Sequence, residues 1–326
     1  MNLDKRKAIG LSRIGSRAAY GVTLMELAEN YDDLMVLCAD TSTSAGLDRF
    51  RKTYPEKYLE VGIAEQNTMG IAAGLASEGM RVAMSTFAPF QTMRCCEQIK
   101  VNLGYMQHKV LFTGLASGVV LGTLGYTHCC IEDLAIMRAI PNITVLSPAD
   151  CGETAKAVEA ALEHHQSVYL RLTGGNPNPP VYKEDYEFEI GKAVTLRDGD
   201  DVGIIATGSM VHPSLKAAEI LAEAGIEASV LNMHTIKPID TLAVADLSAK
   251  CKLLATVEEH TLLGGLGSAV AEAKAPLVDA PPQSMIGITD SYAKAGDYAD
   301  ILAHYHLTPE AIAERIKADY ERVISG

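Results

Sequence analysis

Three short segments of the sequence carry side chains whose types could support acid–base or ring-stacking chemistry. In the first segment, Glu65 stands just before a run of small residues at 70–79 that is rich in Gly and Ala. Small residues let another backbone or a cofactor approach closely. Considered alone, Glu65 fits a carboxylate that the helix dipole stabilises at the start of a helix better than it fits a catalytic group.

The second segment carries apolar rings at a regular spacing. Phe87, Phe90 and Met93 recur every three residues, and the chain has only five phenylalanines. Aromatic faces can stack on a flat ligand ring. The same spacing is typical of the buried side of a helix, so core packing is the better interpretation of these residues taken alone.

The third segment, residues 121–150, places His128 in a turn flanked by glycine, before a helix and a strand. A loop histidine can donate a hydrogen bond to a substrate oxygen or exchange a proton near neutral pH. A single loop histidine is nevertheless more often structural than catalytic, so His128 alone does not identify an active site.

Strand-like and helix-like segments alternate between residues 17 and 173. Short runs rich in apolar and β-branched residues are separated by longer stretches with helical periodicity. This alternation predicts a parallel sheet that is covered by helices. The segments lie at 34–40, 70–79, 80–87, 109–116, 142–150, 153–165 and 167–172.

Pro, Gly and charged residues interrupt this alternation at 174–191, which indicates an interdomain linker. A second series follows, with strand-like segments at 201–208, 227–233, 251–260 and 284–290. A chain of 326 residues also exceeds the usual size of one domain. We therefore predict an α/β protein with two largely parallel sheets flanked by helices, divided into a first domain, a linker and a second domain at 1–175, 176–190 and 191–326.

The composition indicates which kinds of macromolecule the chain can bind and in which cellular compartment it is expected. The formal net charge is −13, so nucleic-acid backbones and anionic membrane surfaces would repel the chain. The sequence shows no apolar signal segment and no apolar run of membrane-spanning length, so we expect a cytoplasmic protein. The seven cysteines lack C-x-x-C spacing, which favours reduced thiols over disulfides or a zinc site.

The three segments, taken in this order and spacing, resemble the pyrimidine-binding domain of the transketolase family. The shared pattern is G-I-x-E before a Gly/Ala helix, then T-F-x-x-F, T-H and R-x-I-P-N-x-x-V-x-x-P-A-D. The resemblance continues through DVGIIATGSMVHPSLKAAEIL, NMHTIKPID and VEEHTLLGGLGSAVAE, so it covers nearly the whole chain. It implies a pyrimidine-binding domain, a transketolase C-terminal domain, and the cofactors thiamine diphosphate and Mg²⁺.

The resemblance implies a cofactor side of the site. Glu65 is similar to the family glutamate that hydrogen-bonds the aminopyrimidine ring and promotes loss of the thiazolium proton. Phe90 matches the residue that stacks on the pyrimidine, with Phe87 beside it and Met93 where an aromatic ring is often found. Methionine sulfur also packs on rings. Asp40 corresponds to the family aspartate near the thiazolium side of the pocket.

The resemblance also implies a substrate side. His128 matches the family histidine that contacts the hydroxyl or carbonyl oxygens at the donor end of the sugar. Arg17, Ser44 and Arg171 align with residues that hold the terminal phosphate, for which a forked guanidinium is well suited. A sulfonate or carboxylate fits the same contacts, and a surface ion pair is the alternative interpretation of Arg171.

The sequence departs from the family pattern in ways that bear on the substrate. Most members have G-E-D-G before the T-H pair, whereas this chain has G-T-L-G, so the apolar Leu124 replaces an aspartate that contacts a donor hydroxyl. Ala116 stands where the family has a histidine near the phosphate. The G-D-G motif and downstream Asn that hold the diphosphate and its metal are absent. The resemblance therefore implies an unusual sugar and a partner subunit that supplies the diphosphate and Mg²⁺ site.

These features predict one subunit of a split, thiamine-diphosphate-dependent transketolase. It would transfer a two-carbon ketol unit from a ketose to an aldose, both with terminal anionic groups, and sulfonated, branched or deoxy sugars are candidates. An N-terminal transketolase subunit would complete the site in a heterotetramer. The enzymatic alternatives are a 1-deoxyxylulose-phosphate-synthase-like subunit and a 2-oxo acid dehydrogenase β subunit, which the segment CCEQIKVN resembles. A non-catalytic regulatory partner is the alternative from another class.

Overall fold

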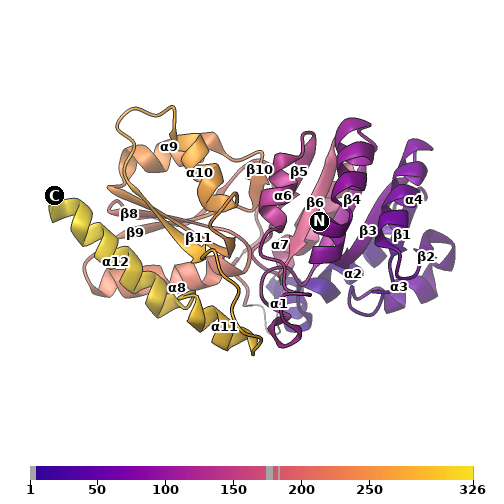
Figure 1. Ribbon diagram of the computed structural model, residues 1–326, viewed down its shortest axis with the longest axis horizontal. Coiled ribbons are helices and arrows are strands. Elements are labelled where there is room, and N and C mark those ends of the chain that lie inside the picture. Colours follow the sequence, from indigo (N-terminus) through magenta and orange to yellow (C-terminus); the bar gives the residue numbers. More distant parts are fainter. Residues whose placement is uncertain (1–4, 174–178, 183, 326) are drawn as a thin grey trace.

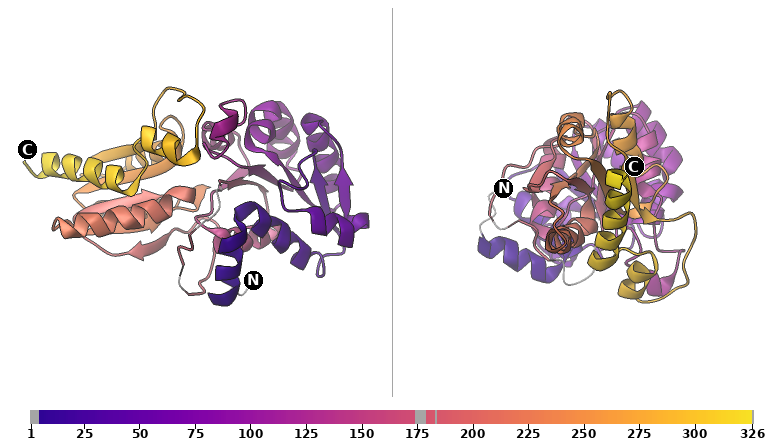
Figure 2. Two further views of the ribbon diagram at one scale, coloured as in Figure 1. Left: turned by 90° about the horizontal axis from the view of Figure 1, so that it is seen from below. Right: turned by 90° about the vertical axis from the view of Figure 1, so that its left-hand side faces the viewer.

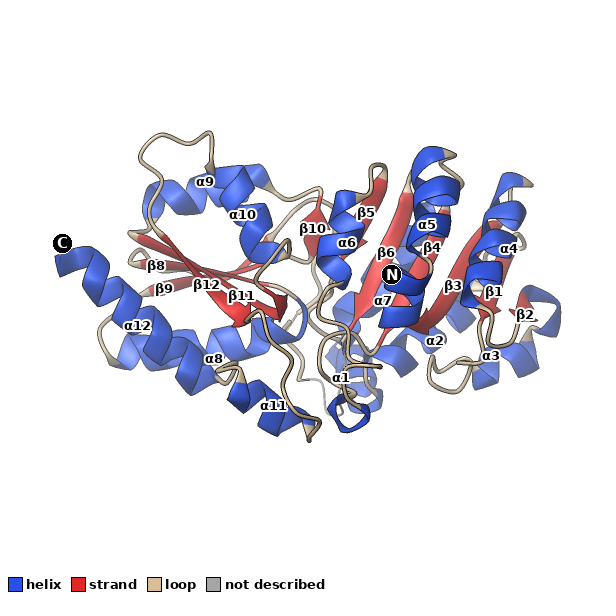
Figure 3. Cartoon of the chain, in the orientation of Figure 1, coloured by secondary structure: helices blue, strands red, loops and turns tan. Residues whose placement is uncertain are grey.

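The computed structural model describes residues 5–173, 179–182 and 184–325, which form two α/β units that lie side by side along the long axis (Figure 1). Each unit contains one sheet with helices on both faces (Figure 3). The predicted fold class, α/β with two largely parallel sheets, is confirmed.

Helices alternate with strands along the described chain, as the sequence rhythm predicts. Among these helices, none has both the length and the apolar character needed to cross a membrane. The α-helices are α1 (Lys5–Ile14), α2 (Ser16–Leu27), α3 (Asp48–Thr53), α4 (Glu65–Ser77), α5 (Cys96–Gln98), α6 (Asp133–Ala139), α7 (Cys151–Glu163), α8 (Val211–Glu223), α9 (Thr241–Lys250), α10 (Leu266–Lys274), α11 (Tyr298–His304) and α12 (Pro309–Ser325). The 3-10 turns are η1 (Pro55–Lys57), η4 (Gly122–Leu124) and η5 (Gly208–Met210), and the π-helical turns are η2 (Phe90–Arg94) and η3 (Ile99–Tyr105).

The first sheet has seven strands in the order β10-β5-β6-β4-β3-β1-β2. Every residue of β4, β5 and β6 is buried, which is typical of parallel strands that helices cover on both faces. Helices α2 and α7 pack on one face, and α4 and α6 pack on the other. The strands are β1 (Leu34–Cys38), β2 (Tyr58–Glu60), β3 (Arg81–Phe87), β4 (Val110–Leu115), β5 (Ile143–Leu146), β6 (Ser167–Leu172) and β10 (Thr235–Lys237).

The second sheet has five strands in the order β12-β11-β8-β9-β7. All neighbouring pairs are parallel except β7 with β9 at one edge. Helices α8 and α12 pack on one face, and α9 and α10 pack on the other (Figure 2). The strands are β7 (Val194–Arg197), β8 (Val202–Ala206), β9 (Ala228–Asn232), β11 (Leu253–Thr261) and β12 (Gln283–Ile288).

Strand β10 belongs to the first sheet although it lies beyond the linker in the chain. Thr235 pairs with Leu146 and Lys237 pairs with Val145, antiparallel to β5. The sequence did not predict this exchange, because three residues are too few to show a strand pattern. We propose that residues 176–190 divide the two domains. The strands before this segment belong to the first sheet and those after it to the second, except for β10.

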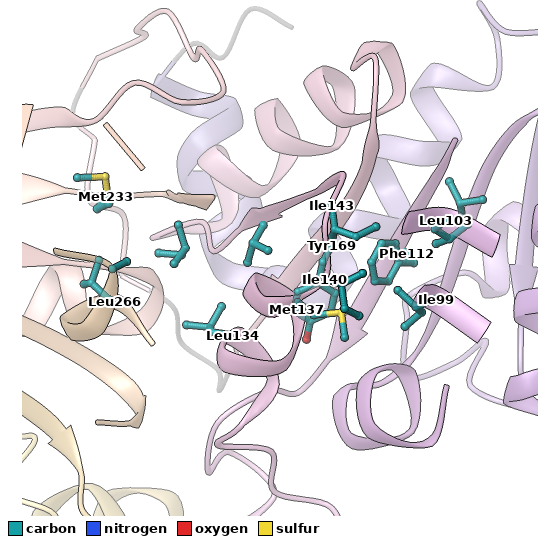
Figure 4. Close-up of a cluster of buried hydrophobic side chains, with 14 of the residues drawn as sticks. Ile99, Leu103, Phe112, Leu134, Met137, Ile140, Ile143, Tyr169, Met233 and Leu266 are labelled. Carbon is teal, nitrogen blue, oxygen red and sulfur yellow. The ribbon is translucent and has the colours of Figure 1, made fainter. Parts of the chain in front are cut away.

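A continuous apolar core joins the two units. Phe112 and Met137 of the first unit belong to the same buried cluster as Met233 and Leu266 of the second (Figure 4). Each of these four residues is fully buried. The junction thus resembles the interior of one domain more than a loose interdomain contact.

The buried carboxylate of Glu153 binds the proposed linker and a strand of the second unit. Residues 176–178 and 183 of that segment lie outside the described part of the chain. The hydroxyls of Tyr182 and Tyr186 each donate to Glu153 Oε1, at 2.8 and 2.7 Å. Asn232 Nδ2 of β9 donates to the same carboxylate at 2.9 Å. The described linker residues are therefore held by tertiary contacts.

Candidate active site

Several of the residues singled out from the sequence lie at the carboxyl edge of the first sheet. Asp40 follows β1, Phe87 ends β3 and Ala116 follows β4. Loops after parallel strands meet at this edge, where open α/β sheets bind ligands. Asp40 and Ala116 both have backbone φ in the left-handed region, at 54° and 53°, which is unfavourable for residues other than glycine. Such strain is often stored at functional sites.

Glu65 begins a helix and also lies at the carboxyl edge of the first sheet. It is the first residue of α4, and its side chain is only 6% exposed. Arg94 donates from Nη1 to Glu65 Oε1 at 2.7 Å, and its guanidinium carbon lies 4.0 Å from the centre of the Phe90 ring. The arginine is itself 44% exposed, so it covers the carboxylate from the solvent side. Arg94 lies one turn after Phe90, but no pattern in the sequence marks it as part of the site.

Two aromatic rings and the predicted histidine form one cluster beside Glu65. The centre of the His128 ring lies 5.5 Å from Phe90 and 6.2 Å from Phe87, with tilted planes. Both phenylalanines are half-buried, and Phe87 also packs against the buried core of the first unit. Met93 is 43% exposed at the same edge. A carboxylate next to a partly open aromatic surface fits an aminopyrimidine ring, which needs a hydrogen-bond partner and a stacking face.

Arg17 and Ser44 lie together, as the family resemblance implies. They line a hollow of about 500 Å³ together with Leu121. Within the described residues Arg17 forms no ion pair, and partial burial lowers the pKa of its guanidinium from the ordinary value. A half-buried cation without a counter-charge suits an anionic group on a ligand. The remaining lining residues are Ile14, Gly15, Ser16, Ala18, Thr43, Gly46 and Val120.

Arg171 does not line this hollow, and its assignment as a substrate-anion ligand is wrong for this structure. The residue is 1% exposed and lies in β6, where every side chain is buried. Its Nε donates to Asp133 Oδ2 at 2.9 Å, and its Nη2 donates to the Glu259 carbonyl oxygen at 2.9 Å. The surface ion pair considered as an alternative is also wrong, because the pair is fully buried.

Further buried groups surround this ion pair. Tyr169 donates its hydroxyl to Asp133 Oδ2 at 2.7 Å. His260 Nε2 lies 3.9 Å from Asp133 Oδ1 and accepts a hydrogen bond from Leu134 N at 3.1 Å. Burial lowers the pKa of His260 to about 4, so the imidazole is neutral near pH 7 and can act as that acceptor.

Metal ligands are not grouped in the part of the chain that the structure describes. No set of three or more His, Cys, Asp or Glu side chains there is placed to hold a metal ion. Asp40 is exposed, and its backbone N–H donates to Glu60 Oε1 at 2.7 Å. The arrangement can therefore present a carboxylate, an aromatic surface, a histidine and a separate cation along one edge.

Comparisons with known proteins identify the family. Residues 12–179 match the transketolase pyrimidine-binding domain, and residues 191–312 match the transketolase C-terminal domain. The chain therefore belongs to the transketolase family, and it is a transferase subunit of the transketolase type. Membership of this family implies dependence on thiamine diphosphate.

Several relatives of similar length are named as sections or subunits of transketolases. A putative transketolase C-terminal section from Methanocaldococcus jannaschii is 40% identical over 311 residues, which are 94% of this chain and 97% of that protein. An apulose-4-phosphate transketolase subunit from Phocaeicola vulgatus is 39% identical over 92% of this chain and 96% of that protein. A solved structure described as a split gene transketolase, inactive beta4 tetramer, has a TM-score of 0.84 at 35% identity and covers 95% of this chain and 98% of that chain.

Two more relatives differ in the substrates that they are named for. A 6-deoxy-6-sulfo-D-fructose transketolase subunit from a Clostridium species is 36% identical over 94% of each chain. A 1-deoxy-D-xylulose-5-phosphate synthase from Trichormus variabilis is 39% identical over all of this chain but only 52% of that protein. This chain thus corresponds to about half of the synthase.

The burial of Arg171 generates a prediction that concerns stability. Arg171→Ala should lower the free energy of unfolding by roughly 3 to 5 kcal/mol, because it leaves the Asp133 carboxylate buried without its counter-charge. Removing both charges, in Arg171→Met with Asp133→Asn, should restore much of that loss. Urea denaturation of the purified chain measures both effects.

A surface ion pair provides the matched control. Arg197→Ala breaks a more exposed pair with Glu227 and should change the free energy of unfolding by about 1 kcal/mol or less. If Arg171→Ala left the unfolding curve unchanged and raised the KM for substrate instead, the structural assignment would be wrong.

Proposed function

We propose that the chain is one subunit of a thiamine-diphosphate-dependent transketolase that transfers a two-carbon ketol unit from a ketose to an aldose. The observation that carries the proposal is the placement of Glu65 beside Phe90 at the carboxyl edge of the sheet, with His128 5.5 Å from the same ring. Thiamine diphosphate, when bound, supplies the thiazolium carbon at which two-carbon units are transferred.

The residues of this chain would hold the pyrimidine end of the cofactor. Glu65 would hydrogen-bond the ring and Phe90 would stack on it, with Phe87 and Met93 beside them and Asp40 toward the thiazolium. In this structure the Arg94 guanidinium hydrogen-bonds one oxygen of Glu65 and covers the open face of Phe90. Since the Arg94 side chain is 44% exposed, it can move to solvent when the cofactor pyrimidine takes its place.

The substrate side would consist of His128 at the donor oxygens and Arg17 with Ser44 at the anionic end. The hollow that these last two residues line supports a terminal phosphate or sulfonate ligand. Leu124 stands where the family has an aspartate that contacts a donor hydroxyl. Its side chain is 55% exposed, so an apolar group faces the space in which that contact would form. Together with the sulfo-fructose relative, this favours a ketose that lacks or alters that hydroxyl contact.

A partner subunit with the diphosphate-binding domain would supply the diphosphate and Mg²⁺ contacts, with a heterotetramer as the expected assembly. Relatives named as subunits support this partner. The surface next to Glu65 is suited to it: the outer face of α4 exposes Gly70 and Gly74, and Tyr105 is 83% exposed beside it. Other exposed apolar residues there are Ile63, Val101 and Met106.

A synthase-like reaction is the second candidate function, because the 1-deoxy-D-xylulose-5-phosphate synthase relative matches the whole chain. The two reactions differ in the donor, which is a ketose for a transketolase and pyruvate for the synthase. Product analysis of the assembled complex with each donor distinguishes them. A 2-oxo acid dehydrogenase β subunit or a non-catalytic role would give neither product.

Glu65→Gln should abolish most of the turnover of the assembled complex. Loss of a positioned acid–base group typically costs about 10²- to 10⁴-fold in rate, and an amide cannot exchange the proton. Steady-state kinetics measures the change, and calorimetry with thiamine diphosphate and Mg²⁺ shows whether binding is retained. The matched control is Glu78→Gln at the far end of α4, which is exposed and should leave kcat unchanged. Full activity of Glu65→Gln would contradict the proposed function.

Leu124 should disfavour ordinary sugar phosphates as donors. We expect xylulose 5-phosphate to have a lower kcat/KM than a deoxy, branched or sulfonated ketose, and Leu124→Asp to shift the ratio toward xylulose 5-phosphate by about tenfold, the value of one added hydrogen bond. Thr123→Asp, at the exposed neighbouring position, should not shift it. A wild-type preference for xylulose 5-phosphate would refute the substrate inference.

Gly70→Leu should block assembly without harming the fold of the chain. A Cβ atom at Gly70 meets no atom within 4 Å, and replacing a helical glycine should stabilise α4 by up to about 1 kcal/mol. Analytical ultracentrifugation with the partner subunit measures assembly, and thermal unfolding measures the fold. Ala318→Leu, on the exposed side of α12, is the control. Normal assembly of Gly70→Leu would show that the partner docks elsewhere.

A further inference from the structure

The proposed donor-contacting residues lie on a closed loop, residues 118–130. Gly118 N donates to the Cys130 carbonyl at 2.7 Å, and Cys130 N donates back to the Gly118 carbonyl at 2.8 Å. These two hydrogen bonds hold the ends of the loop together. Leu124 and His128 lie between them, so their positions depend on what fixes the loop.

Glu259, at the end of β11, holds the first residues of this loop from the second unit. Its Oε1 accepts from Val119 N at 2.7 Å, and its Oε2 accepts from the hydroxyl of Tyr298 at 2.7 Å and from the hydroxyl of Ser209. The residue is 1% exposed. A carboxylate this deeply buried is stable only while its hydrogen bonds are made, so it constrains the positions of all three donors.

The backbone around Glu259 is adapted to this close contact. Gly118 has φ of 73°, and a Cβ atom there would lie 2.2 Å from Glu259 Oε1. A side chain at this position would therefore push the carboxylate away. On the other side, Arg171 Nη2 donates to the Glu259 carbonyl at 2.9 Å, which ties the residue to the buried ion pair with Asp133.

The second unit also holds the tip of the loop. Gly296 N donates to the Gly122 carbonyl at 3.1 Å, and the hydroxyls of Tyr126 and Tyr305 hydrogen-bond at 2.9 Å. A Cβ atom at Gly122 would collide with Ile301 of α11, so the backbone and the helix are in direct contact. The loop is thus braced by the second unit at its start and at its tip.

We propose that Glu259 is a positioning residue: by holding Val119 it fixes the 118–130 loop, and it thereby sets where Leu124 and His128 stand relative to the donor sugar. The consequence for donor binding rests on the proposed function, whereas the consequence for the order of the loop does not. The C-terminal domain thereby shapes the substrate side of the site.

The neighbouring residue provides a matched control. Glu258 is also fully buried, and its two oxygens accept hydrogen bonds from Leu266 N at 2.7 Å and Gly267 N at 2.8 Å, at the start of α10. Its carboxylate therefore binds two backbone amides of its own unit rather than the loop. Glu258→Gln makes the same carboxylate-to-amide change one residue away and should affect the stability of the second unit alone.

Hydrogen exchange of the full chain tests the structural part of the inference. In Glu259→Gln, the amides of residues 118–130 should exchange about tenfold faster or more, because the glutamine side chain has one acceptor oxygen where the carboxylate has two. Tyr298→Phe removes one donor only and should give a smaller increase in the exchange rate of the same peptides. This variant provides the test if Glu259→Gln folds poorly. Unchanged exchange of the loop in both variants, or an equal increase in Glu258→Gln, would overturn the inference.

Kinetics of the assembled complex tests the functional part. Tyr298→Phe and Glu259→Gln should raise the KM for the ketose donor, by about tenfold in Glu259→Gln, while the KM for thiamine diphosphate stays within about twofold of the wild type. A uniform loss of kcat with unchanged donor KM would overturn the positioning role. If loop exchange rises as expected but the wild-type complex has no transketolase activity, the proposed function fails and the structural role of Glu259 stands.

Discussion

The ion pair between Arg171 and Asp133 is the constraint on which the arrangement of this protein depends. A guanidinium and a carboxylate are removed from water at the meeting point of β6, α6 and β11, and burial of either charge alone would be prohibitive. Tyr169 and the Glu259 carbonyl bind the same two groups, so the pair connects the first sheet to β11 of the second. Together with the shared apolar core, this network holds the two sheets against each other.

The two sides of the active edge depend on that junction to different degrees. The first unit alone positions Glu65, Phe87 and Phe90, which follow directly from the strands and the π-helical turn at its carboxyl edge. The loop with His128 is different, because its supports come from the other unit. The cofactor side of the site is thus built into one sheet, whereas the donor side depends on the contact between both.

Much of this could be predicted from the sequence, for physical reasons that differ between residues. Fully apolar runs such as β4 and β5 indicate a sheet buried on both faces, and the family pattern located Glu65, Phe90 and His128 at its edge. Arg171 was assigned to the substrate anion from the family resemblance, although an arginine in a strand buried on both faces needs a buried partner. The partner, Asp133, is 38 residues away in the chain, and sequence spacing does not show such a distance in space.

Arg94 and Glu259 show a second limit. Each acts through contacts with residues distant in sequence, so no local pattern marks them: Arg94 reaches back 29 residues to Glu65, and Glu259 reaches 140 residues back to Val119. Glu259 did stand within a recognised motif, VEEHTLLGGLGSAVAE, but the motif indicates only a strand followed by a Gly-rich turn. Which of its two carboxylates faces the other unit is decided by the pleat of β11.

The exchange of β10 into the first sheet has a consequence for how the chain is made. Residues 143–146 form a short, wholly buried strand whose outer edge is covered only when residues 235–237 pair with it. While the ribosome has produced the first unit but not yet β10, this edge offers unpaired backbone groups to any neighbouring chain. The nascent protein therefore passes through a stage at which pairing between molecules competes with completion of its own sheet, and that stage ends only when about three quarters of the chain has emerged.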